Sequence, residues 1–122
     1  MRALLAASLL VLPLALRAQG LAIPCNPEGS QAELNACAVD AFHRAEREMN
    51  ETYEAVMAAL APDRRKALRA EQDAWLNDRG RKCTDEVRQF EGGSIWRQMY
   101  LGCRQVETQA RASEIARWAA RK

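Results

Sequence analysis

The sequence predicts an all-α fold, a small antiparallel three-helix bundle held by two disulfides. Apolar residues recur at steps of three and four in three segments, and proline or glycine turns separate these segments. The chain has four cysteines and no stretch of strand-like alternation. Its 122 residues, 48% hydrophobic and 28% charged, suit one globular domain.

The N-terminus has the pattern of a secretory signal peptide. Arg2 gives a positive start, residues 3–16 are uncharged and mostly apolar, and Ala18 offers a small residue for cleavage. The apolar run is shorter than the about 20 residues of a membrane-spanning helix, so we expect no stable membrane anchor. We therefore expect a cleaved signal peptide at 1–18, an N-terminal segment at 19–29 and a helical domain at 30–119, exported to the periplasm or secreted.

The charge of the exported part argues against a nucleic-acid partner. The leader holds two of the 18 basic residues, so its removal leaves basic side chains equal in number to the 16 acidic ones. A nucleic-acid binder normally carries a basic patch that displaces counterions from phosphates. Here acids and bases alternate at helical spacing, which is typical of the solvated faces of helices.

The first helix is predicted to begin at a capping box. Ser30 and Glu33 have the spacing at which the serine oxygen accepts a first-turn amide while the glutamate reaches back. Residues 34–60 contain no proline or glycine, and one stripe recurs at steps of three and four: Leu34, Ala38, Ala41, Ala45, Met49, Thr52, Val56 and Leu60. The alanines in its middle let a neighbouring helix approach closely.

Two further helices follow. Pro62 suits a first-turn position, and a helix from about 63 to 90 places one face on Leu68, Gln72, Trp75, Arg79, Cys83 and Phe90. Gly92-Gly93-Ser94 predicts a turn. A third helix from about 94 to 119 carries an apolar stripe of Ile95, Met99, Cys103, Val106 and Ala110, and a second stripe of Trp96, Tyr100 and Trp118.

All four cysteines, Cys25, Cys37, Cys83 and Cys103, lie in the exported part, where disulfides form. A fold-back at the Gly92-Gly93 turn brings Cys83 level with residue 102, which favours the pairs Cys83–Cys103 and Cys25–Cys37. A fold-back at Pro62 also brings Cys37 within about one turn of Cys83, so that pairing remains an alternative.

Polar residues interrupt the apolar face of the second helix. Gln72, Trp75, Arg79 and Cys83 form the motif Q-x-x-W-x-x-x-R-x-x-x-C on one face. We interpret Trp75 as a core residue. A long arginine can bury its stem and bond to an acid or a carbonyl, so we interpret the polar residues as structural, and Thr108 and Arg111 likewise.

These motifs resemble the exported LprI-like domain, a family named after a mycobacterial lysozyme inhibitor. Residues 30–37 (SQAELNAC) resemble its opening T-Q-x-E-M-N-x-C, residues 49–53 its L-N-x-x-Y, and residues 92–94 its G-G-S turn. Cys103, Thr108, Arg111 and Ile115 match its closing C-x4-T-x2-R-x3-L, with Ser30 and Ile115 as conservative departures. The resemblance covers Cys25 to about Ile115 and implies an all-helical, disulfide-bonded periplasmic domain with lysozyme inhibition as its named activity.

Two binding functions follow. In the first, the chain blocks lysozyme or another peptidoglycan hydrolase, and a stiff turn enters or covers the cleft that holds the enzyme's two carboxyl groups. The expected contact residues are Gly92, Gly93 and Ser94, flanked by Trp96 and Tyr100. In the second, the chain is a general periplasmic interaction or structural module of envelope stress, without lysozyme activity.

A hydrolase is the least favoured function. The exported part has few serines, one histidine and no carboxylate pair in a shared apolar environment. The cysteine spacings contain no C-x-x-C motif, and Cys37, Asp40 and His43 stand at steps of three that spread them across a helix face. We therefore expect no catalytic residue, no metal and no cofactor.

Overall fold

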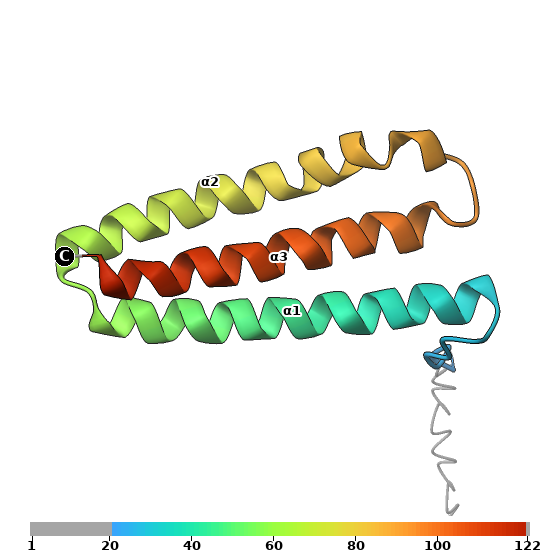
Figure 1. Cartoon of the computed structure of the whole chain (residues 1–122), viewed down its shortest axis with the longest axis horizontal. Coiled ribbons are helices and arrows are strands. Elements are labelled where there is room, and N and C mark those ends of the chain that lie inside the picture. Colours follow the sequence, from blue (N-terminus) through green and yellow to red (C-terminus); the bar gives the residue numbers. More distant parts are fainter. Residues whose placement is uncertain (1–20, 122) are drawn as a thin grey trace, which may run out of the picture.

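The computed structural model describes residues 21–121, which form three long helices, α1 (Gln31–Ala59), α2 (Pro62–Glu86) and α3 (Trp96–Ala120), and one short 3-10 helix, η1 (Arg88–Phe90). Figure 1 shows α2 running opposite to both α1 and α3. The fold is the three-helix bundle that the sequence predicts. The expected signal peptide lies outside the described residues. Among the described helices, none is long and apolar enough to cross a membrane.

Local chemistry sets the helix ends. The Ser30 hydroxyl accepts the Glu33 backbone N–H, and the Glu33 carboxylate accepts the Ser30 backbone N–H at 2.7 Å, so the predicted capping box is present. Pro62 occupies the first position of α2, where its missing N–H costs nothing. At the other end, Arg64 donates to the carbonyl of Trp118 at 2.9 Å and so caps the C-terminus of α3.

Two boundaries differ from the prediction. The second helix ends at Glu86 instead of continuing to Phe90, because the backbone then tightens into η1 with i to i+3 bonds such as Phe90 N–H to Val87 O. The third helix begins at Trp96, two residues later than expected, after the turn of residues 91–95.

The helices pack unequally. Short turns join α1 to α2 and α2 to α3, yet the closest backbone approach is between α1 and α3, which run parallel (Figure 1). The alanine-rich stripe of α1, with Ala45 buried, allows this close contact. Longer side chains keep α2 farther away.

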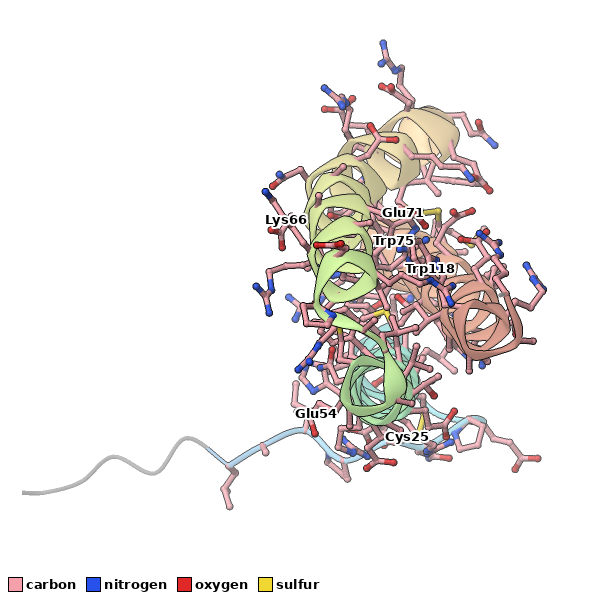
Figure 2. The ribbon with its side chains drawn as sticks, turned by 90° about the vertical axis from the view of Figure 1, so that its left-hand side faces the viewer. Cys25, Glu54, Lys66, Glu71, Trp75 and Trp118 are labelled. Atoms are coloured by element: carbon pink, nitrogen blue, oxygen red, sulfur yellow. A yellow bond between two sulfur atoms is a disulfide. The ribbon has the colours of Figure 1, made fainter. Side chains whose placement is uncertain are left out.

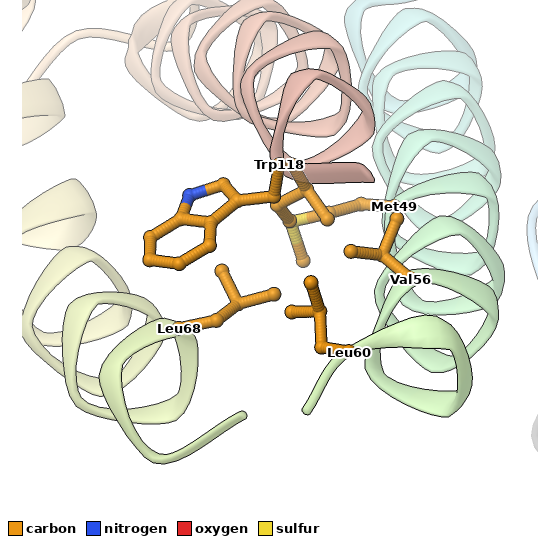
Figure 3. Packing of buried hydrophobic residues seen from close by; sticks show 6 residues of the cluster. Met49, Val56, Leu60, Leu68 and Trp118 are labelled. Atoms are coloured by element: carbon orange, nitrogen blue, oxygen red, sulfur yellow. The ribbon is translucent and has the colours of Figure 1, made fainter. Parts of the chain in front are cut away.

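An apolar cluster fills the end of the bundle near the α1–α2 turn. Met49, Val56 and Leu60 of α1 meet Leu68 of α2 and Trp118 of α3 (Figure 3), together with buried Ile115. In the end view, Trp75 and Trp118 both lie in the space between α2 and α3 (Figure 2). The two disulfides lie at the opposite end, so the bundle has an apolar end and a disulfide end.

Of the two stripes predicted on α3, only part of one contributes to the core. Trp118 is buried, whereas Ile95, Met99 and Val106 of the other stripe are 40%, 36% and 62% exposed. The buried face of α3 consists instead of Thr108, Arg111, Ile115 and Trp118. The apolar stripe of α3 therefore lies at the surface, because polar residues occupy the packing face.

Candidate functional site: the disulfide end

The turn between η1 and α3 is short and exposed. Gly92 has a φ of 78°, in the left-handed region that favours glycine, and a Cβ on Gly93 would lie 3.2 Å from the Phe90 carbonyl oxygen. The Gly93 N–H donates to that oxygen at 3.0 Å. Ser94 is exposed at the tip. The backbone conformation therefore favours glycine at Gly92, a side chain at Gly93 would make a tight contact, and the turn presents a defined shape to solvent.

Two aromatic rings follow the turn on α3. Trp96 and Tyr100 stack with centroids 4.9 Å apart and planes 8° from parallel. Both side chains are half-buried. The Tyr100 hydroxyl approaches α2 at Gly80, where an added Cβ would lie 3.6 Å from it. The stack thus supports the start of α3 against the end of α2.

The disulfides brace this end in the pairing that the Gly92-Gly93 fold-back favours. Cys83 of α2 and Cys103 of α3 are bonded with Cα atoms 5.7 Å apart. Cys25 and Cys37 tie the N-terminal segment to α1, with Cα atoms 4.4 Å apart. The alternative pair Cys37–Cys83 does not form.

The polar motif residues lie inside the bundle. Gln72, Arg79, Thr108 and Arg111 are only 5%, 6%, 0% and 3% exposed, and Trp75 packs against the apolar cluster. Their side chains therefore have almost no surface to offer a partner.

Arginines and aromatic rings alternate between the helices in what we call the ladder: Tyr100, Arg104, Phe42, Arg79, Trp75 and Arg111. Arg104 lies 4.4 Å from the Phe42 ring centroid and 5.5 Å from that of Tyr100. Arg79 lies 5.2 Å from the Phe42 centroid and 5.0 Å from that of Trp75, which Arg111 approaches at 5.9 Å. These cation–π contacts connect all three helices.

Hydrogen bonds fix the two most buried arginines. Arg79 donates to the Thr108 hydroxyl at 2.9 Å and to the Glu46 carboxylate at 3.0 Å. Burial lowers the pKa of the Arg79 guanidinium, and the neighbouring charge of Arg104 lowers it further. The hydrogen bond to Glu46 and the negative charge of Glu46 raise the pKa of Arg79 and so oppose both effects. Arginine remains charged even so, because its ordinary pKa is far above neutrality.

Arg111 closes the other end of the ladder. Its Nε donates to Gln72 at 2.8 Å, and one terminal nitrogen donates to Glu71 at 2.8 Å and Glu114 at 3.0 Å. Gln72 in turn reaches the Met49 sulfur at 3.6 Å. The ladder is thus a connected polar layer between the apolar end and the disulfide end.

Sequence reasoning missed two members of the ladder, Phe42 and Arg104, and the acidic partners of its arginines, which are Glu46, Glu71 and Glu114. Arg104 stands four residues before Thr108, so its helical spacing places both on one face. This four-residue spacing is the feature of the sequence from which the position of Arg104 could have been predicted. The choice of Glu46 as the partner of Arg79 depends on tertiary packing.

The residues weighed for metal binding do not gather. His43 is exposed beside the Phe42 ring, and Cys37 is in a disulfide. Within residues 21–121 no group of three metal-binding side chains occurs.

Comparison with known proteins agrees with these features. A family model described as lysozyme inhibitor LprI matches residues 25–115, which include both disulfides, the turn and the ladder. An uncharacterized protein of Rhizobium meliloti (strain 1021), R02472, is 33% identical over 106 residues, covering 75% of each chain. No solved structure matches significantly. The disulfides and the family indicate an extracytoplasmic protein. The chain belongs to the LprI lysozyme inhibitor family.

Proposed function

We propose that the chain is an exported binding protein that blocks a lysozyme or another peptidoglycan hydrolase. The observation that carries the proposal is the family match over residues 25–115. In this proposal residues 1–18 are a signal peptide that is removed on export, and residues 30–119 act in the periplasm or outside the cell. The chain contributes binding and no bond-breaking chemistry.

The turn of Gly92, Gly93 and Ser94 is the proposed contact with the enzyme. It is exposed, its backbone is fixed by hydrogen bonds, and the Cys83–Cys103 disulfide braces the helices behind it. A preordered turn loses little conformational entropy when it docks, so more of its contact energy appears as affinity. Trp96 and Tyr100 would contact the rim of the cleft.

The bound turn would inhibit the enzyme by keeping the substrate out of its cleft. A lysozyme cleaves its polymer between two carboxyl groups in a cleft, and a turn lodged there denies the sugar chain access to both. Substrate and inhibitor then compete for one site. We expect the apparent KM for cell-wall substrate to rise with inhibitor concentration while kcat stays constant.

The test is a titration of a basic c-type lysozyme with the exported, oxidised protein, followed by the rate of cell-wall lysis. We expect competitive inhibition. Ser94→Trp should weaken inhibition about tenfold or more by adding bulk at the tip. Ser113→Trp, a matched change at an exposed serine farther along α3, should have no effect. Undiminished lysis at high micromolar inhibitor would refute the proposal.

A further inference from the structure

The outer face of α3 carries an apolar groove at the disulfide end. Met99 and Val106, both exposed, lie on one face with Gly102 between them. Leu34 and Ala38 of α1, Val87 after α2 and Pro27 before α1 add to the apolar lining. The groove has a volume of about 660 Å³, within the range of natural ligand-binding clefts.

Gly102 forms an open notch in this groove. A Cβ built on Gly102 meets no atom within 4 Å, so neither close helix packing nor a positive φ requires glycine there. Glycine in a helix interior destabilises the helix relative to almost any other residue. The notch therefore costs helix stability and leaves room for a side chain from outside.

The walls of the groove are rigid. Cys37 and Cys103, one from each disulfide, line it. A surface held by two cross-links changes little on docking, which limits the entropy lost. The groove lies at the same end of the bundle as the Gly92 turn.

The charge of the groove indicates what it accepts. Its charged lining residues are Glu86 and Glu107, and no basic residue lines it. Glu107 pairs with Lys82 at 2.7 Å, whereas none of the ion pairs within residues 21–121 includes Glu86. An apolar side chain with a lysine or arginine beside it complements this surface.

A second copy of the chain is a poor complement. In a two-fold pair the same patch of each copy faces the other, so the acidic rims would meet. Like charges brought together at an interface oppose association.

We propose that this groove binds a basic segment with an apolar tip on the target hydrolase, while the Gly92 turn occupies the enzyme's cleft. This inference rests on the proposed function for the identity of the partner. The basic and apolar character of the bound segment is inferred only from the residues that line the groove.

The experiment combines a peptide probe with the lysis assay. The probe is a short, labelled amphipathic peptide of leucine and lysine, and its binding to the exported protein is followed by fluorescence anisotropy. A peptide of leucine and glutamate serves as the charge control. We expect the lysine peptide to bind at least about tenfold more tightly than the glutamate peptide.

Three variants alter the groove. Val106→Lys adds a repelling charge, Glu86→Lys reverses the charge of one of the two lining acids, and Gly102→Leu fills the notch. Each should weaken both peptide binding and lysozyme inhibition about tenfold. Gly102→Leu should at the same time raise the Tm, because leucine favours a helix more than glycine does. A folding defect cannot produce that combination.

Matched controls lie elsewhere on the surface. Leu76→Lys changes a 42% exposed apolar residue of α2, and Glu54→Lys reverses an exposed charge on the outside of α1 (Figure 2). Both should bind the peptide and inhibit lysozyme as the unmodified protein does.

The outcomes separate the two proposals. Peptide binding that is equal in the groove variants and the unmodified protein, or equal for the two peptides, overturns the groove inference whatever the lysis assay gives. Groove-dependent peptide binding without lysozyme inhibition supports the groove and overturns the proposed function. A dimer in sedimentation that Gly102→Leu dissociates overturns the inference in favour of a second copy.

Discussion

Replacing Arg79 with alanine tests whether the ladder stabilises the bundle. The substitution removes the bonds to Thr108 and Glu46 and the contacts with two aromatic rings. Removing one partner of a buried ion pair typically costs about 3–5 kcal/mol. Glu46 is 31% exposed and can be hydrated in the variant, so we expect the lower limit, about 3 kcal/mol.

The expected loss is large for a domain of this size. A domain of about 100 residues has a stability of about 5–15 kcal/mol, and each kcal/mol shifts the Tm by about 4–8 °C. We therefore expect Arg79→Ala, at about 3 kcal/mol, to lower the Tm by about 12–24 °C. Urea unfolding of the oxidised protein, followed by circular dichroism, measures the free energy directly.

Arg79→Met separates polar contacts from packing. Methionine fills much of the arginine volume and also removes the repulsion with Arg104, but it cannot donate to Thr108 or Glu46. We expect it to cost about 1–2 kcal/mol, less than alanine. If Arg79→Met is as stable as the unmodified protein, the hydrogen bonds of Arg79 contribute nothing net, and the ladder stabilises only by filling space.

Three further changes test the disulfide end. Replacing Cys83 and Cys103 together with serine opens a cross-link with a sequence separation of 20, and should cost about 3 kcal/mol in urea unfolding. Gly92→Ala forces a side chain into a φ of 78° and should lower stability in the same assay by about 1–2 kcal/mol. The backbone N–H of Ser30, and then its hydroxyl, hold the pKa of Glu33 below its ordinary 4.5. This lowered pKa stabilises the fold above pH 4.5 and the effect is lost as the pH falls through the folded value. The Glu33→Gln variant should therefore have a lower free energy of unfolding than the unmodified protein at pH 7, and the two proteins should be equally stable in strong acid.

Some features were predictable because local chemistry decides them. Ser30 with Glu33, Pro62 and the glycine pair have strong backbone preferences, and they mark helix ends close to those observed. Chain geometry favoured the observed disulfide pairing, because a tight turn places Cys83 opposite Cys103, but it left Cys37–Cys83 as an alternative that the structure excludes.

The orientation of α3 was harder to predict. Hydrophobic periodicity favours the stripe of Ile95, Met99 and Val106, yet these three residues are exposed. The buried face carries Thr108 and Arg111, whose polar groups can be buried only because they form hydrogen bonds with side chains of α2. A hydrophobicity pattern takes no account of such partners. The groove was unpredictable for the same reason, because it forms where three separate segments meet.

The position of the motif limits where recognition can occur. Residues such as Arg79 and Thr108 cannot reach a partner unless the helices separate, because both are almost fully buried and bond to each other inside the bundle. The ladder instead holds α2 at a fixed distance from the closely packed pair of α1 and α3. That spacing sets the position of the turn and the groove, which both lie where α2 returns to α3 at Cys83 and Cys103. The motif can thus set the shape of the proposed binding surface without being part of it. A relative could keep the same ladder and bind a different partner through changes at the turn and the groove.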